Sequence, residues 1–294
     1  MSNDAMRTTV GVVADQRQAV IAEGPDAVAF LQGQISQDVE ALAPGEASWS
    51  LVLHPQGKIS AWFRITRITD ERFILDLDAG WADELLTRLN RFKLRTAINI
   101  SLAPWHAMTI VGPGADDVAV DGVEHDMIAS WAGVPVRDVF GANLAVSADL
   151  PVFDDVSLTA LRIEAGVPKM GAELDESTIP AAAGIVEQSV SFTKGCYTGQ
   201  ELVARIDSRG NNVPKRLLSL VIEGADAPPV GAEVAAGDKA VGVVTSTAWS
   251  PHLDSFVGLA YINRSADVGQ AVTVGVEGGT HQPAMIHELP LVRG

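Results

Sequence analysis

The sequence predicts an α+β domain followed by a small β-barrel domain, and three observations support this fold class. The first part of the chain mixes helical and strand-like spacing of apolar residues. After about Pro214, the apolar segments are short, rich in β-forming residues and separated by Gly, Pro and Asp. The length of 294 residues also suggests two domains, at about 150 residues each. We therefore predict domains at residues 1–207 and 208–294.

Up to residue 165, the first domain is expected to contain three helices and a β-hairpin. Apolar residues that recur every three or four positions indicate a helix, whereas alternating ones indicate a strand. Helical spacing covers residues 25–42, 81–92 and 156–165, and strands at 58–65 and 73–77 are joined by a turn at 69–71. Gly166 ends the third helix because glycine adopts the left-handed conformation common at helix ends, and Pro168 follows it.

The second domain is expected to be all β. Four strands are predicted at residues 216–222, 240–247, 256–262 and 271–276, and residues 207–214 form the candidate linker before them. Short strands at this spacing are typical of a sandwich or barrel.

Composition limits the classes of function. The chain carries 37 acidic and 21 basic residues, a formal net charge of −16, and 47% hydrophobic residues. Proteins that bind nucleic acid broadly need excess Lys and Arg, so we expect no direct nucleic-acid partner. One cysteine excludes an internal disulfide. No signal peptide and no apolar run of about 18 residues is visible, which predicts a cytoplasmic protein without a membrane partner.

Two segments are locally basic. Residues 194–216 hold five basic and two acidic residues, and a carboxylate-bearing ligand suits such a stretch because Arg grips a carboxylate at two points. A second group lies between residues 88 and 95, which we interpret as solvated helix-end charges. Its members are Arg88, Arg91, Lys93 and Arg95.

The segment Lys194-Gly-Cys-Tyr-Thr-Gly-Gln-Glu201 contains the single cysteine. A thiol acts as nucleophile or metal ligand in its thiolate form, which nearby cations and helix N-termini favour. Lys194 stands two positions before Cys196, and Gly195 and Gly199 allow a sharp turn. The alternative is a structural cysteine, because free cysteines are often buried as small apolar residues.

A helix is expected just after this cysteine. Thr198 and Glu201 have the spacing of a capping box, so the following residues to Ile206 are predicted to be helical. Cys196 then lies just outside a helix N-terminus, where unpaired N–H groups carry partial positive charge.

Residues Lys194 to Arg205 resemble the signature K-G-C-Y-x-G-Q-E-x-V-A-R of the YgfZ-type folate-binding proteins. These are relatives of the glycine-cleavage T-protein that act in iron-sulfur cluster assembly or repair. The resemblance implies a T-protein-like folate-binding domain followed by a small C-terminal β-barrel. It extends over nearly the whole chain in the family's order, through Phe30-Leu-Gln-Gly-Gln-Ile-Ser-Gln-Asp-Val39, Gly57-Lys58, Leu161-Arg-Ile-Glu-Ala-Gly-Val-Pro168, Ser208-Arg-Gly210 and Gly242-Val-Val-Thr-Ser246.

The resemblance also implies how a folate is held. It places Glu164 where the T-protein glutamate holds the pterin ring, and a carboxylate can accept paired hydrogen bonds from an aminopyrimidine edge. By the same resemblance Arg216 contacts the folate tail, with Lys215 as its neighbour, and Arg205 is a further candidate in the basic stretch.

One departure from the T-protein pattern bears on the reaction. T-proteins carry G-I-L-D-D where this chain has Gly57-Lys-Ile-Ser-Ala61, and an aspartate of that pair takes part in aminomethyl transfer. Ser60 and Ala61 supply no anionic base. Asp76 and Asp78, on the next strand, are expected to face solvent because alternation places them opposite the apolar side.

The sequence therefore predicts a tetrahydrofolate-binding accessory protein in iron-sulfur cluster assembly or repair, acting through Cys196, rather than a classical enzyme. Lys194 favours the thiolate, while Tyr197 and Gln200 orient their neighbours. The expected partners are folate and iron-sulfur client enzymes or assembly proteins, including clients in tRNA modification. No stably bound metal is expected, since six scattered histidines and one cysteine match no metal motif. The alternatives are a folate-dependent aminomethyltransferase and a folate-binding module with a structural cysteine.

Overall fold

The computed structural model describes residues 3–14 and 16–293 and divides the chain into two compact units. One unit contains Met1–Ala14, Ala107–Glu173 and Pro214–Gly294, and the other contains Asp15–His106 and Leu174–Val213. Each unit is thus assembled from segments distant in the sequence. The predicted fold class is confirmed, with mixed α and β structure followed by a C-terminal barrel. The predicted domain boundary between residues 207 and 208 stays a prediction.

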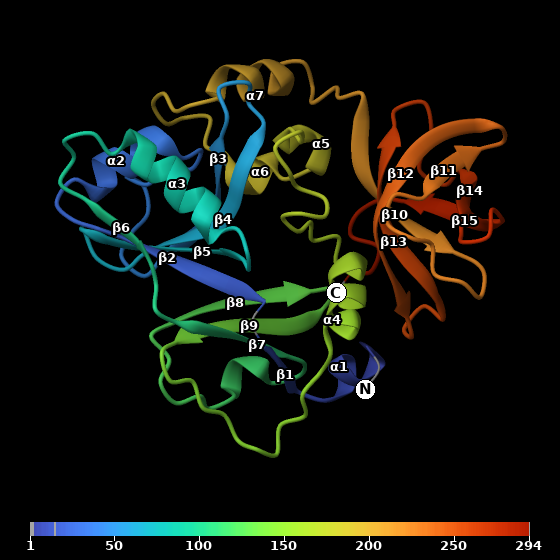
Figure 1. Cartoon of the computed structure of the whole chain (residues 1–294), viewed down its shortest axis with the longest axis horizontal. Helices are drawn as coiled ribbons and strands as arrows, with labels where there is room; N and C mark the ends of the chain where they lie inside the picture. The colour runs from blue at the N-terminus through green and yellow to red at the C-terminus, as the bar shows by residue number, and fades with distance from the viewer. Residues whose placement is uncertain (1–2, 15, 294) are drawn as a thin grey trace. The chain divides into compact units, whose positions relative to one another are not determined.

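The unit of Asp15–His106 and Leu174–Val213 is built on a five-stranded antiparallel sheet with the order β3-β4-β5-β2-β6 (Figure 1). Its strands are β2 (Arg17–Glu23), β3 (Ala47–Leu53), β4 (Ile59–Arg67), β5 (Arg72–Asp78) and β6 (Asn99–Leu102). Its helices are α2 (Ala27–Gln34), α3 (Ala82–Phe92), α5 (Pro180–Ala183), α6 (Val186–Ser189) and α7 (Gln200–Asp207). The predicted hairpin is confirmed as β4 and β5.

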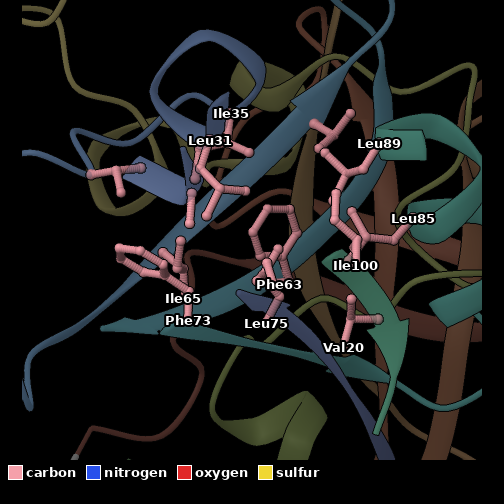
Figure 2. Close-up of a cluster of buried hydrophobic side chains, with 14 of the residues drawn as sticks. Val20, Leu31, Ile35, Phe63, Ile65, Phe73, Leu75, Leu85, Leu89 and Ile100 are labelled. Carbon is pink, nitrogen blue, oxygen red and sulfur yellow. The ribbon is translucent and has the colours of Figure 1, made fainter. Parts of the chain in front are cut away.

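The core of this unit lies between one face of the sheet and helices α2 and α3. Figure 2 shows Phe63 and Phe73 of the sheet among side chains from both helices, including Leu31 and Leu85. All four are almost completely buried. Burial of side chains of this size stabilises a fold by about 1.5–3 kcal/mol each. Because apolar residues alternate along β4 and β5, they lie on one face of the sheet, and helices α2 and α3 pack against that face.

The predicted helix over residues 25–42 is too long. Helix α2 ends at Gln34, and Ile35 is already extended. The backbone N–H of Ser36 donates to the carbonyl of Leu51 on β3, and the Ser36 hydroxyl donates to the carbonyl of Ser189. These long-range hydrogen bonds replace the next helical turn. The apolar side chains that suggested a longer helix are still buried, because Val39 and Leu42 reach the same core from an irregular segment.

The other unit combines a four-stranded sheet of order β1-β7-β9-β8 with a closed six-stranded barrel of order β10-β13-β12-β11-β14-β15 (Figure 1). Outside the barrel lie α1 (Asn3–Thr8), β1 (Gly11–Ala14), β7 (His106–Val111), a 3-10 turn (Ala115–Asp117), β8 (His125–Trp131), β9 (Val134–Gly141) and α4 (Asp155–Glu164). The barrel strands are β10 (Lys215–Ile222), β11 (Glu233–Ala236), β12 (Lys239–Ser250), β13 (Ser255–Asn263), β14 (Ala271–Gly275) and β15 (His281–His287).

The four predicted C-terminal strands are confirmed as β10, β12, β13 and β14, whereas β11 and β15 were not predicted. The predicted helix over residues 156–165 is confirmed as α4, and Gly166 follows it in the left-handed conformation with φ 69°. A buried ion pair between Arg162 and Glu173 joins α4 to the barrel, because Glu173 also accepts from the hydroxyls of Thr245 and Ser246 on β12.

Within the described residues, no helix is long and apolar enough to cross a membrane.

Candidate functional site

The cysteine motif forms the loop between α6 and α7 (Figure 1). Cys196 is a free, exposed cysteine at the centre of this loop. An exposed thiol makes no contribution to core packing. Cys196 therefore lacks the burial that is expected of a structural cysteine. The loop belongs to the unit of Asp15–His106 and Leu174–Val213, together with the five-stranded sheet.

Lys194 fixes this loop to the end of helix α2. Its buried ammonium donates to the backbone carbonyls of Gln32 at 2.7 Å, Ile35 at 2.8 Å and Gln37 at 2.8 Å. An ammonium has three N–H donors, and all three are engaged here. None is left for the thiolate of Cys196. The three hydrogen bonds give Lys194 a positioning role at the C-terminus of helix α2, where cations are favoured. Its expected effect on the Cys196 thiolate stays a prediction.

The environment of Lys194 is buried and aromatic. Burial lowers the pKa of Lys194 to about 8, and the nearby carboxylates Asp38 and Glu40 oppose that shift. The ammonium also lies 5.3 Å from the centre of the Tyr197 ring. Burial raises the pKa of Tyr197 to about 12. Lys194 and Tyr197 thus form the buried side of the loop, while Cys196 between them faces outward.

Gly199 brings the end of the loop against the turn between β3 and β4. It has φ 85°, and a Cβ at this position would lie 2.7 Å from the carbonyl oxygen of His54 and 2.8 Å from Cβ of Leu53. Gly57 approaches from the turn in the same way, with φ 67° and Leu202 2.8 Å from its added Cβ. This close contact needs glycine on both sides.

The predicted capping box at the start of α7 is wrong. Helix α7 begins at Gln200, its N-cap is Gly199, and no side chain caps it. Thr198 is therefore one position too early to act as the N-cap. The close approach of Gly199 to the turn between β3 and β4 determines this helix start. Sequence spacing alone does not reveal that approach.

We expect Gly199→Ala to destabilise the protein and disturb the loop. The left-handed backbone alone costs a non-glycine residue about 1–2 kcal/mol, and the contact with the His54 carbonyl adds to that cost. Gly195→Ala is the matched control because no atom lies within 4 Å of its added Cβ. Denaturant unfolding and the rate of Cys196 alkylation measure both effects. Equal destabilisation by the two alanines would contradict this account of the loop.

A polar cavity lies beside the same turn. Its volume is about 340 Å³, and it is lined by His54, Gln56, Lys58, Glu176 and Ser177. It offers an ammonium and a carboxylate at an open surface, and it flanks Gly57, which packs against α7.

Glu164, the expected pterin contact, is completely buried at the end of α4. One carboxylate oxygen accepts from the Ser250 hydroxyl at 2.6 Å and the other from the Arg7 guanidinium. A pterin ring therefore reaches this buried carboxylate only if the side chains that cover it move. The role of Glu164 stays a prediction.

The basic folate candidates are exposed. Lys215 and Arg216 begin strand β10, and the Lys215 ammonium lies 4.6 Å from the centre of the Tyr261 ring. Both belong to the unit that contains Glu164, whereas Arg205 on α7 belongs to the other unit. Their contact with a folate also stays a prediction.

The positions of the T-protein aspartates hold no free carboxylate. Ser60 is buried, and its hydroxyl donates to Glu84 on α3 at 3.3 Å, while Ala61 is part of the hydrophobic core. Glu84 is therefore the carboxylate that the fold brings to this position, and no sequence pattern predicted it. Glu84 and Ser60 lie on different elements, and no pattern in the sequence near either residue predicts that they are in contact.

Asp76 does not face solvent, contrary to expectation. It is completely buried on β5, where the guanidinium groups of Arg64 and Arg17 donate to it, each at 2.8 Å from Nε. Alternation correctly places it opposite the apolar face, but that face is covered by arginines and by stacked Trp49 and Trp62, whose ring centres are 3.9 Å apart. A carboxylate that accepts charge-assisted hydrogen bonds from two arginines is not free to act as a base. The cross-strand register of Arg64 and Asp76 was the available signal.

Among the residues that the structure describes, no three His, Cys, Asp or Glu side chains group together as a metal site. A metal or cluster ligated by Cys196 needs further ligands from another molecule.

Comparison with known proteins defines the class of the fold. The description "GCVT N-terminal domain" matches residues 2–145, and "Glycine cleavage T-protein C-terminal barrel domain" matches residues 215–292. The crystal structure of glycine cleavage system aminomethyltransferase T from Bartonella henselae aligns with a TM-score of 0.85 over 99% of this chain and 89% of that chain, at 20% identity. The chain therefore has a T-protein-like fold.

Three curated relatives indicate the range of the family. An uncharacterized protein of Haemophilus influenzae is 30% identical over 67% of this chain and 68% of its own length. An aminomethyltransferase of Rubrobacter xylanophilus is 28% identical over 99% of this chain and 85% of its own length. The mitochondrial iron-sulfur cluster assembly factor IBA57 homolog of Neurospora crassa is 28% identical over 74% of this chain and 55% of its own length. The chain belongs to the glycine-cleavage T-protein (GcvT-like) family.

Proposed function

We propose that this protein is a tetrahydrofolate-binding accessory factor in iron-sulfur cluster assembly or repair, acting through Cys196. The observation that carries the proposal is the exposed thiol of Cys196 within the twelve-residue YgfZ-type motif, on a loop fixed by Lys194. A single thiolate holds no cluster alone, since these clusters normally need several. Cys196 therefore ligates a cluster only transiently, together with ligands from a client enzyme, an assembly protein or a small thiol.

Two comparisons support this proposal. The Neurospora crassa relative carries the name of an iron-sulfur cluster assembly factor, and its similarity covers 74% of this chain. The T-protein-like domains support a folate ligand. In the proposed complex, Glu164 holds the pterin ring after the side chains that cover it move, and Arg216 with Lys215 binds the carboxylates of the glutamyl tail.

The test compares iron-sulfur enzyme activity in cells with and without this protein. We expect cells that lack it to lose activity of a client such as a tRNA methylthiotransferase, and the wild-type gene to restore that activity. Activity of an enzyme without a cluster serves as the control. Client activity that does not depend on the protein would refute the proposed function.

A folate-dependent aminomethyltransferase is the second candidate, because relatives with that name match almost the full chain. The residues at the T-protein aspartate positions argue against it, since Ser60 and Ala61 provide no base and Asp76 is paired with arginines. We expect purified protein to show no turnover with a lipoyl-bound aminomethyl donor and tetrahydrofolate. Turnover that disappears in Glu84→Gln would instead assign the base to Glu84 and establish the transferase.

A further inference from the structure

The segment from Arg91 to Arg95, here called the basic ridge, stands out on a chain with a net charge of −16. It consists of Arg91, Phe92, Lys93, Leu94 and Arg95, at the end of α3 and just beyond it. Phe92 is 45% exposed and Leu94 is 82% exposed. In the described part of the chain, no carboxylate pairs with the three cations. Helix-end charge accounts for Arg91 and for Lys93 at the C-cap, whereas Arg95 lies beyond the helix.

The exposure of Phe92 is a departure from the helix pattern. Leu85 and Leu89 occupy the same helical face and are completely buried, so spacing predicts that Phe92 is buried as well. The ring instead lies over the guanidinium of Arg88, 4.1 Å from its central carbon. The ridge therefore presents a ring held from below by a cation, rather than a loose apolar side chain.

Arg88 adds a further positive charge beneath the ridge. Its side chain is buried, Nη2 donates weakly to the carbonyl of Leu53 at 3.4 Å, and Nη1 has no hydrogen-bond partner among the described residues. Burial lowers the pKa of Arg88, with Arg91 acting in the same direction and Glu84 opposing it, but a guanidinium stays charged at neutral pH. Leu53 also contacts Gly199, so Arg88 connects the ridge to the base of the cysteine loop within one unit.

We propose that the basic ridge is a docking surface for a partner protein with an acidic patch around apolar side chains. Exposed apolar groups rimmed by charge mark interaction sites, and opposite charge steers such a partner to a basic ridge on a molecule with a net charge of −16. Three cations are few for a nucleic acid, because a polyanion longer than the ridge meets the negative remainder of the chain. A partner protein, unlike a nucleic acid, can carry acidic groups on the patch that faces the ridge and none elsewhere.

Photo-crosslinking tests this surface in cells. A benzoylphenylalanine at Leu94 of the full chain is expected to form a protein adduct on illumination, whereas one at Val230, 71% exposed in the other unit, is not. Combining Arg91→Glu with Arg95→Glu is expected to reduce the Leu94 adduct at least about tenfold, which corresponds to about 1.4 kcal/mol. The captured partner peptide is expected to carry Asp or Glu beside apolar residues. Unfolding midpoint and Cys196 alkylation rate confirm that the charge-reversed protein is folded.

Each other outcome overturns the proposal. An acidic partner protein at the ridge is excluded if Leu94 forms no adduct, or if charge reversal does not reduce the adduct. It is also excluded if the adduct contains nucleic acid or a second copy of this chain. The same crosslink in Cys196→Ala separates docking from thiol chemistry. Its persistence supports the ridge whether or not the proposed iron-sulfur function holds, and its loss would assign partner binding to the thiol.

Discussion

Cells that carry Cys196→Ala in place of the wild-type protein are expected to lose activity of the iron-sulfur client as completely as cells that lack the protein. The proposed chemistry needs a thiolate, and this chain has one cysteine. The side chain is exposed, so its truncation is expected to change the free energy of unfolding by no more than about 0.5 kcal/mol. Function and stability are therefore expected to separate clearly in this variant.

The experiment places wild type, Cys196→Ala and Cys196→Ser in cells that lack the native gene, and measures tRNA methylthiotransferase activity. Serine keeps the size and polarity of the side chain but supplies no thiolate, so it is expected to fail as alanine does. Tetrahydrofolate binding by the purified variants is expected to match wild type. Full rescue by Cys196→Ala would reduce the thiol to a bystander and leave a folate-binding module as the better description.

Sequence patterns located the core better than they located the ends of elements. Val39 and Leu42 are buried as the helical spacing implies, yet helix α2 ends at Gln34. The difference arises because Ser36 bonds to β3 and to Ser189, 153 residues later in the chain. Periodicity reports which side chains are apolar, whereas the end of a helix depends on which distant groups compete for its backbone.

The candidate site shows the same division. The motif predicted that Cys196 lies just outside a helix N-terminus, and the structure places it in the loop before α7. The motif did not predict where the Lys194 side chain goes. The three carbonyls that bind its ammonium lie 157 to 162 residues earlier in the chain. Proximity in sequence favoured the cysteine as partner, while the fold supplied better acceptors at a helix end. Asp76 was misplaced for a similar reason, since alternation identifies a face but not the arginines that cover it.

Lys194→Met is expected to free the cysteine loop and to impair the protein in cells nearly as much as loss of the thiol. Methionine preserves length and apolar contact but leaves the carbonyls of Gln32, Ile35 and Gln37 without their donor. A buried acceptor left unpaired costs about 1–3 kcal/mol, offset in part by removal of a buried charge. We therefore expect a loss of about 1–3 kcal/mol in the free energy of unfolding and a changed rate of Cys196 alkylation.

The pH dependence of stability tests whether the Lys194 ammonium causes the expected loss of stability in Lys194→Met. The folded pKa of Lys194 is about 8, against an ordinary value of 10.5, so between these pH values the unfolded chain binds more protons than the folded one. The free energy of unfolding rises with pH wherever the unfolded state binds more protons. Between these two pKa values, the wild type is therefore expected to gain stability with rising pH, and Lys194→Met is expected to lack this gain. Lys194→Arg keeps the charge, but its planar group does not converge on three carbonyls as an ammonium does, so partial rescue is expected. Identical pH profiles for wild type and Lys194→Met, together with unchanged Cys196 alkylation, would show that the three hydrogen bonds do not position the loop.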